Sequence, residues 1–220
     1  MQAQAVKHIL LDLDGTLTDP KQGIHACIYH AMQKQQQPLD PNLNIDWTIG
    51  PPLKQSFKIL LNTEDDAVAD QAVADYRERF SSIGLFENTV YASVAETLAW
   101  LQTQGYGLYL ATSKPHVYAK RILEYFDLAQ YFTHIYGSEL TGERTDKAEL
   151  IAYILQQQHL DAKQCLMVGD RKYDIQGAQE NQVRSVAVTY GYGTTEELQQ
   201  AEPDTYIHDF SQLKGLLASS

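Results

Sequence analysis

The chain alternates between short apolar runs and longer segments in which apolar residues recur every three to four positions. The first run, Val6 to Leu11, is almost unbroken in apolar character, which is typical of a parallel strand covered on both faces. Later runs of the same kind predict further strands, and the segments between them predict helices, so we expect an α/β fold. The later predicted strands are Tyr106–Ala111, Thr133–Gly137, Cys165–Val168, Val183–Val188 and Thr205–Ile207.

Between the first two strands the pattern is helical throughout. Ile24, Ile28 and Met32 lie four residues apart and form one apolar helix face. A wholly helical excursion between two strands suggests an inserted domain over residues 19–88, with a core domain over 1–18 and 89–220. The insertion can also be read as a small helical domain with no gating role. The helices predicted here are Pro20–Gln36, Leu53–Leu61 and Asp65–Phe80.

The core domain contains further amphipathic segments. Leu150, Ile151 and Ile154 form the inward face of one of them, which Thr145 or Asp146 can cap. The helices predicted in the core domain are Tyr91–Gln104, ended by Gly105 as a C-cap, one that begins at Pro115, Asp146–Gln157 and Phe210–Leu217.

The composition fits one core domain plus a modest insertion. Of the 220 residues, 44% are hydrophobic and 20% are charged, as in ordinary soluble proteins. The net charge of −11 argues against a surface that follows nucleic-acid phosphates. Cys27 and Cys165 lack neighbours with metal-ligand spacing, so we expect both to be buried small hydrophobes.

The N-terminus lacks a signal-peptide pattern, and no segment of the sequence is long and apolar enough to span a bilayer. We therefore expect a cytoplasmic protein with neither a nucleic-acid nor a membrane partner. The sequence fixes no oligomeric state.

The first apolar run ends in Asp12-Leu13-Asp14-Gly15-Thr16. Carboxylates two residues apart project to the same side of an extended chain, and Gly15 then lets the backbone turn. The two acids thus stand at the carboxyl end of a strand, where open α/β sheets bind ligands. Because Asp12 and Asp14 repel each other, we expect a cation between them, beside a nucleophile and a proton donor.

Two other interpretations of these acids are a surface turn and a calcium-binding loop. An EF-hand loop has its glycine at the sixth position and a closing glutamate at the twelfth, whereas Gly15 stands at the fourth.

Three later segments contain candidate partners for the two acids. Thr112 begins Thr-Ser-Lys-Pro after a strand, where a hydroxyl, N–H groups and a helix dipole would converge on an oxyanion, unless Thr112 is a simple N-cap. Lys147 lies in the first turn of a helix, where the macrodipole disfavours a cation and a bound phosphoryl group would compensate, although a surface lysine is the alternative. Asp170 ends a strand, and Asp174 lies one helical turn later near the same pocket, with a helix cap as the alternative.

In this order the segments resemble the four motifs of the haloacid dehalogenase-like (HAD) phosphohydrolases. The first motif, hhhhDxDGT followed by Leu or Val, x and Asp, is similar to DLDGTLTD at Asp12–Asp19. Ala111–Pro115 resembles the second motif, Lys147 the third, and GDRKYD at Gly169–Asp174 the fourth, GDxxxD. The resemblance covers the chain from Val6 to about residue 188. It implies a doubly wound, Rossmann-like, mostly parallel sheet with an inserted α-helical cap in the C1 position.

The resemblance also implies Mg2+-dependent hydrolysis of a small phosphomonoester through an aspartyl-phosphate. Asp12 would be the nucleophile and Asp14 the general acid and base, while Thr112 and Lys147 would contact phosphate oxygens. The metal ligands would be the Asp12 carboxylate, the Asp14 backbone carbonyl, the Asp170 carboxylate and Asp174, the last either directly or through water. Further candidates for substrate contact are Thr16, Ser113, Lys114 and Arg171.

Two substrate classes are indicated. Tyr136–Leu155 together with Gly169–Asp174 resembles a bacterial branch associated with 5'-nucleotidase activity on nucleoside monophosphates. Thr112–Pro115 resembles phosphoglycolate phosphatases. A haloacid dehalogenase usually lacks an acid equivalent to Asp14, so that chemistry is disfavoured. A sugar-phosphate mutase would share all four motifs, and a non-catalytic binding module should have lost one of the key residues, which are all present.

Two positions depart from the family pattern. Pro20 stands where Ser is frequent after the first motif, and Ala92-Ser93 replaces a frequent Pro-Gly. We therefore expect a different local geometry before the second strand.

Two remaining features carry weaker signals. In the predicted cap, Trp47, Lys54 and Arg77 are candidates for substrate contact, with packing or solvation as the alternative. The loop Tyr190–Gly193 is rich in glycine but lacks a P-loop or dinucleotide fingerprint, so we assign it no phosphate role.

Overall fold

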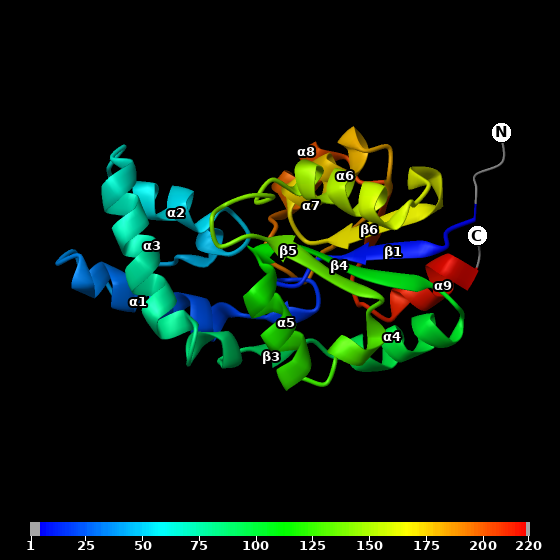
Figure 1. Ribbon diagram of the computed structural model, residues 1–220, viewed down its shortest axis with the longest axis horizontal. Coiled ribbons are helices and arrows are strands. Elements are labelled where there is room, and N and C mark those ends of the chain that lie inside the picture. Colours follow the sequence, from blue (N-terminus) through cyan, green and yellow to red (C-terminus); the bar gives the residue numbers. More distant parts are fainter. Residues whose placement is uncertain (1–4, 219–220) are drawn as a thin grey trace. The chain divides into compact units, whose positions relative to one another are not determined.

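The computed structural model describes residues 5–218, which form two compact units (Figure 1). One unit contains the chain up to Thr18 and from Val90 onward, and the other is Asp19–Thr89. These limits lie close to the division expected at residues 19 and 88, and the assignment of the insert as a cap stays a prediction. Among residues 5–218, no helix has the length and apolar character needed to cross a membrane.

The first unit is built on a six-stranded parallel sheet with the order β5-β4-β1-β6-β7-β8. The chain starts at β1, adds strands on one side, and then crosses to add strands on the other. Open α/β sheets bind ligands at such a reversal, outside the carboxyl ends of the strands, and here the reversal falls at β1. The register aligns Leu11 of β1 with Leu110 of β4 and Val168 of β6, so the residues that follow them share one edge. The strands are β1 (His8–Leu11), β4 (Gly107–Pro115), β5 (His134–Ser138), β6 (Cys165–Gly169), β7 (Arg184–Val188) and β8 (Thr205–Ile207).

Helices cover both faces of this sheet, which confirms the predicted doubly wound α/β fold. Figure 1 shows α4, α5 and α9 on one face and α6, α7 and α8 on the other. Ile9, Leu10 and Leu11 are completely buried, and Leu10 packs in one cluster with Leu150 and Ile154 of α6, as the apolar pattern predicted. The helices are α4 (Val94–Thr103), α5 (His116–Tyr125), α6 (Lys147–Gln158), α7 (Lys172–Glu180), α8 (Thr195–Ala201) and α9 (Gln212–Ala218).

Several helices start one to three residues later than predicted, α9 for example at Gln212 rather than Phe210, and for two of them the backbone before the helix gives the reason. The helix expected from Tyr91 begins at Val94, since Ser93 adopts a left-handed φ of 62° that a helix does not admit. Ser93 stands where the family pattern often has glycine, and its hydroxyl donates to Asp209 Oδ1 at 2.9 Å. Pro115 has an extended ψ of 128° and pairs with β5, so α5 begins at His116 rather than at Pro115.

Helix α8 is too short for the hydrophobic pattern to reveal. A local signal nevertheless exists, because Thr194 and Glu197 have the spacing of a capping box. The Thr194 hydroxyl accepts a hydrogen bond from the Glu197 N–H at 3.1 Å, which fixes the start of the helix.

The second unit is a helical assembly in which α1 packs on α3 and on a short 3-10 helix, Gly84–Phe86. Two glycines make this contact close. A Cβ on Gly23 would lie 2.0 Å from the Gly84 carbonyl oxygen, and one on Gly84 would lie 2.4 Å from Cys27 Sγ. Cys27 and Cys165 are both buried, as expected. The elements are α1 (Lys21–Lys34), α2 (Leu53–Leu60) and α3 (Asp66–Phe80), with a two-stranded sheet of β2 (Thr18–Asp19) and β3 (Thr89–Val90) where the chain passes between the units.

We expect Gly23→Ala to destabilise the second unit, because the new Cβ would overlap a backbone carbonyl. Overpacking of this kind costs about 1–3 kcal/mol, so the midpoint of thermal unfolding followed by circular dichroism should fall. Gly215→Ala in α9 is the matched control, since a Cβ there meets no described atom within 4 Å. A midpoint for Gly23→Ala equal to that of the control would contradict the close contact.

Candidate functional site

The backbone at the end of β1 sets the direction of the first two acids. The Asp12 N–H donates to the Val168 carbonyl at 3.0 Å, which extends the strand pairing by one residue. Gly15 follows with a φ of 83°, and a Cβ on it would lie 2.2 Å from Asp170 Oδ2. Glycine is therefore required here both by the left-handed backbone and by the approach of a carboxylate.

Three buried carboxylates meet at this edge of the sheet. Asp12 follows β1, Asp170 follows β6, and Asp174 lies in the first turn of α7; each offers an oxygen, and these oxygens lie within 4.8 Å of one another. All three residues are buried, with Asp170 completely inaccessible. Carboxylate oxygens are the ligands that hard divalent cations prefer, so this cluster can hold such an ion.

Lys147 ties two of these acids together. Its Nζ lies 2.9 Å from Asp12 Oδ1 and 2.7 Å from Asp174 Oδ1, and it donates to the Ala111 carbonyl at 2.8 Å. Asp146 caps α6 by accepting the Glu149 N–H at 3.0 Å, which fixes the helix that positions Lys147. Burial alone would lower the pKa of Lys147, but the charges of Asp12 and Asp174 raise it above its ordinary value. Lys147 is therefore a buried ammonium and not a surface lysine.

Asp14 lies in a second ion pair at the same edge. Lys114 Nζ is 2.7 Å from Asp14 Oδ2 and 2.9 Å from Oδ1. Burial raises the pKa of Asp14, and the neighbouring Lys114 offsets part of that rise. The Thr112 hydroxyl accepts the Lys114 N–H at 3.3 Å, and the Ser113 carbonyl accepts the Ser138 hydroxyl at 2.7 Å. The end of β4 is thus held in the conformation that directs Lys114 to Asp14.

The Tyr190–Gly193 loop, whose sequence indicates no phosphate role, contacts Asp170 directly. The Tyr192 N–H donates to Asp170 Oδ2 at 2.7 Å, and a Cβ on Gly191 would lie 2.4 Å from the Asp170 Cβ. Thr16, a predicted substrate contact, donates its hydroxyl to Asp170 Oδ1 at 3.4 Å. The spacing Gly-x-Gly was the available signal, but a backbone contact leaves no chemical signature in a sequence.

Arg171, another predicted substrate contact, points its guanidinium at Glu197 of α8. Nε and Nη2 donate to Oε1 and Oε2 of Glu197 at 2.8 and 3.1 Å, and the Lys172 N–H also donates to Oε1 at 2.9 Å. Burial raises the pKa of Glu197, but these hydrogen bonds outweigh burial and bring it below its ordinary value. Meanwhile the Arg171 backbone N–H donates to Asp174 Oδ2 at 3.0 Å. Arg171 therefore joins α8 to the acids of the site.

The charge balance of the site leaves room for a cation. Four buried or nearly buried acids face two lysine ammonium groups, while the Arg171 charge is matched by Glu197. Burial raises the pKa of Asp170 well above its ordinary value, and the charges of Asp174 and Asp12 raise it further. A divalent ion among the three carboxylates would offset this excess, so the donor set fits a hard metal ion. The four acids are Asp12, Asp14, Asp170 and Asp174.

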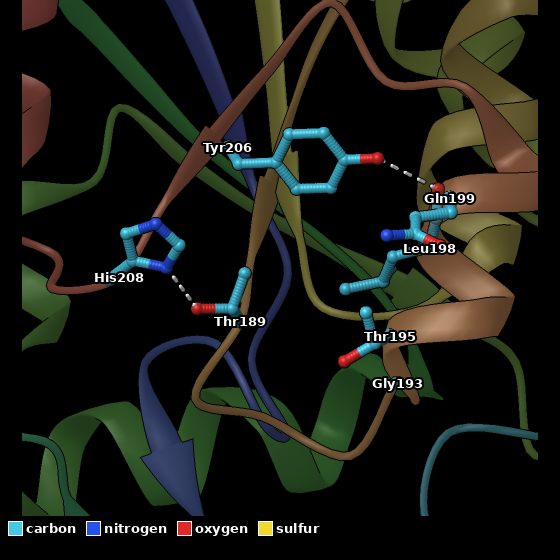
Figure 2. Close-up of a pocket in the computed structure, with 7 residues that line it drawn as sticks. All are labelled: Thr189, Gly193, Thr195, Leu198, Gln199, Tyr206 and His208. Atoms are coloured by element: carbon cyan, nitrogen blue, oxygen red, sulfur yellow. Dashed lines mark hydrogen bonds between the residues drawn. The ribbon is translucent and has the colours of Figure 1, made fainter.

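A separate hollow of about 490 Å3 lies between the end of β7, α8 and β8 (Figure 2). Within it, Thr189 Oγ1 and His208 Nδ1 are 2.7 Å apart, and the Tyr206 hydroxyl donates to the Leu198 carbonyl at 3.3 Å. The acids of the candidate site do not line it. Gly193 lines the hollow and also packs against Asp170, because a Cβ on Gly193 would lie 2.0 Å from the Asp170 carbonyl oxygen.

The three candidates in the predicted cap lie in the second unit. Lys54 Nζ pairs with Asp70 at 3.0 Å and Asp66 at 3.4 Å, which joins α2 to α3 on the surface. Trp47 is 37% exposed, and Arg77 lies half-buried in the last turn of α3. Their contact with substrate stays a prediction.

Comparison with known proteins places the chain among related sequences and structures. A family model described as haloacid dehalogenase-like hydrolase matches residues 9–188, most of the chain. The chain is 43% identical to a 5'-nucleotidase of Pseudomonas aeruginosa over 96% of each chain, and 31% identical to a phosphoglycolate phosphatase of Aliivibrio fischeri over 97% of each. Its fold matches the crystal structure of a predicted phosphatase from Clostridium acetobutylicum with a TM-score of 0.94 and 36% identity, over 99% of this chain and 100% of that one.

We expect Lys147→Met to destabilise the metal-free protein at neutral pH, because it leaves two buried carboxylates without their cation. Breaking a buried ion pair in this way costs about 3–5 kcal/mol. The free energy of unfolding in urea, with EDTA present, measures this loss. Lys120→Met in α5 is the control, since its Nζ only pairs with Glu124 at 3.7 Å on the surface. Such exposed pairs contribute about 0.3–0.5 kcal/mol, so equal losses for the two variants would refute the role given to the buried ammonium.

Proposed function

The chain belongs to the haloacid dehalogenase-like hydrolase family and is a phosphatase of that family, and from this premise we propose that it hydrolyses nucleoside 5'-monophosphates with Mg2+ and an aspartyl-phosphate intermediate. The observation that carries the proposal is the buried cluster of Asp12, Asp170 and Asp174, two of which, Asp12 and Asp174, pair with the ammonium of Lys147. A carboxylate, a cation and a set of metal ligands are thereby brought together at one strand end, which is the arrangement that phosphoryl transfer needs.

In the proposed first step, an Asp12 carboxylate oxygen attacks phosphorus and the bond from phosphorus to the leaving oxygen breaks. Asp14 gives its proton to that oxygen, so the alcohol leaves uncharged and Asp12 carries the phosphoryl group. In the second step Asp14 takes a proton from water, and the water oxygen attacks the phosphorus, which releases inorganic phosphate and restores Asp12. The ion pair of Asp14 with Lys114 supports this role, because it holds in one position a carboxyl that stands two residues after the nucleophile.

Thr112 and Lys147 are proposed to bind the non-bridging oxygens of the phosphate. Lys147 is the better supported of the two, because its Nζ already lies 2.9 Å from the attacking carboxylate of Asp12. Asp12, Asp170, Asp174 and the Asp14 backbone carbonyl are proposed to hold Mg2+, with Asp174 directly or through water. When bound, the ion would supply positive charge that lets an anionic nucleophile approach an anionic substrate.

We further propose that the helical insert, Asp19–Thr89, acts as a cap that reads the leaving group. Its position in the sequence between the first and second motifs supports this role. A cap excludes bulk water from the reacting groups and gives the enzyme a means to distinguish one phosphomonoester from another. Cytoplasmic localisation and a small-molecule phosphomonoester substrate belong to the same proposal.

We expect Asp12→Asn to lower phosphatase turnover at least about a thousandfold, because an amide cannot form the acyl phosphate. The measurement is phosphate release from p-nitrophenyl phosphate, with circular dichroism to establish that the fold is intact. Asp127→Asn is the matched control: Asp127 is exposed and has a left-handed φ of 55°, which asparagine tolerates. Full activity in a folded Asp12→Asn protein would rule out the nucleophile assignment.

We expect nucleoside 5'-monophosphates to be hydrolysed with a kcat/KM at least about tenfold above that of phosphoglycolate, because the relative named 5'-nucleotidase shares more of this sequence. A panel of nucleoside monophosphates, phosphoglycolate and sugar phosphates, each assayed for phosphate release with Mg2+ and with EDTA, makes the measurement. Preference for phosphoglycolate would reverse the substrate assignment and leave the mechanism intact. Conversion of a sugar phosphate to its isomer without phosphate release would indicate a mutase. Full activity in EDTA would refute the requirement for a metal ion.

A further inference from the structure

Glu197 lies outside the four motifs, yet its carboxylate accepts hydrogen bonds from Arg171, a residue of the fourth motif. Arg171 stands between Asp170 and Asp174 in the chain. Its side chain and its backbone N–H bind different acids. The guanidinium donates two hydrogen bonds to Glu197, at 2.8 and 3.1 Å, whereas the backbone N–H donates to Asp174 Oδ2 at 3.0 Å. The position of Glu197 thus fixes the segment that presents both carboxylates.

Glu197 also holds the start of helix α7. The Lys172 N–H, at the first residue of α7, donates to Glu197 Oε1 at 2.9 Å. A carboxylate at this place satisfies an unpaired N–H of the first turn and interacts favourably with the helix dipole. Asp174 lies in this same first turn, so its distance to Lys147 and Asp12 depends on how α7 is anchored.

The backbone of Glu197 is held by the capped first turn of α8. Glu197 is the third residue of α8, and its N–H donates to the capping hydroxyl of Thr194 at 3.1 Å. In a capping box the carboxylate at this position turns back to its own helix, whereas the Glu197 carboxylate accepts from Arg171, the N-cap of α7, and from Lys172, its first residue. Thr194 and Glu197 thus have the sequence spacing of a capping box, but the Glu197 carboxylate binds the start of the neighbouring helix α7.

The chain before α8 reaches the same cluster by a second route. Tyr192 donates its N–H to Asp170 Oδ2 at 2.7 Å, five residues before Glu197. A Cβ on Gly193 would lie 2.0 Å from the Asp170 carbonyl oxygen, so the backbone packs directly against the acid. Figure 2 shows Gly193 and Thr195 next to each other where the loop enters α8. One short segment therefore binds both residues: Tyr192 binds Asp170, and Glu197 binds Arg171.

We propose that Glu197 is a positioning residue for the Mg2+ ligands Asp170 and Asp174, acting through Arg171 and the first turn of α7. Glu197 touches neither substrate nor reacting atoms in this role. Its second effect is electrostatic, since it holds the Arg171 cation on α8. Without that carboxylate, the guanidinium is drawn toward the charge of Asp170 and competes with a metal ion for it. The inference rests on the proposed metal site and adds a residue that the family motifs do not contain.

The test is the affinity for Mn2+, which prefers the same oxygen ligands as Mg2+ and whose free ion is counted by electron paramagnetic resonance. Loss of a residue that orients metal ligands weakens binding about 10–100-fold. We therefore expect the Mn2+ Kd of Glu197→Gln to rise at least about tenfold, because the amide lacks the charge and turns an N–H toward Arg171. Phosphatase activity of this variant should recover at high Mg2+, since only the occupancy of the site is reduced.

Glu196→Gln is the matched control, because it removes a neighbouring exposed acid of the same helix and should bind Mn2+ like the parent. The double variant Arg171→Gln/Glu197→Gln should recover part of the lost affinity, because the competing guanidinium is gone. If Glu197→Gln does not fold, Glu197→Asp replaces it, with the same expected direction because the carboxylate is withdrawn by one methylene.

The two proposals fail in distinguishable ways. A parent protein that binds no Mn2+ in the millimolar range would overturn both the metal site and the positioning role. A parent that binds the ion, with an unchanged Kd in folded Glu197→Gln, would overturn the positioning role alone and leave the proposed function standing.

Discussion

The ammonium group of Lys147 is the charge on which the geometry of the site depends. It lies within 3 Å of oxygens from the end of β1, from β4 and from α7: those of Asp12, Ala111 and Asp174. Buried charges are stable only when they are paired and hydrogen-bonded, because desolvation costs several kcal/mol for each ion. A cation at the start of a helix is disfavoured by the helix dipole, and here two acids compensate for that cost. One nitrogen therefore fixes the relative positions of three elements.

Close backbone approach is the second condition for this site. Gly15, Gly169 and Gly191 each bring main chain against a carboxylate, since a Cβ at any of them would lie within 2.4 Å of an atom of Asp170 or Asp174. The close approach lets peptide N–H groups reach the buried acids beside their side-chain partners, as the hydrogen bond from Tyr192 to Asp170 illustrates. Paired charge and glycine contacts together explain how so acidic a cluster is accommodated at the edge of an apolar sheet.

The acids of the site divide into two environments, and this division suits the proposed chemistry. Asp14 pairs with Lys114 and is not one of the three acids whose oxygens gather within 4.8 Å, which are Asp12, Asp170 and Asp174. A proton donor needs a neighbourhood that does not force it to stay ionised, while metal ligands need to stay charged. Burial raises the pKa of Asp14 and thereby favours its protonated form, with Lys114 as the opposing influence. Burial raises the pKa of Asp170 as well, so the charged partners separate the two roles: Lys114 pairs with Asp14, whereas Lys147 and a bound metal ion would favour the charged form of the metal ligands.

The sequence by itself determined the fold class and the residues at the strand ends. The unbroken run before Asp12, the apolar face of α6 and the paired acids are local patterns, set by the period of a strand or a helix and readable without coordinates. What joins distant segments was decided only by the tertiary structure. That Arg171 turns to Glu197, that the Tyr190–Gly193 loop holds Asp170, and that Ser93 delays a helix all depend on contacts between parts of the chain far apart in sequence. Such contacts follow from packing in three dimensions, and the periodicity of a sequence reports only local structure. The chemical groups could therefore be predicted from the sequence, whereas their partners could be identified only in the structure.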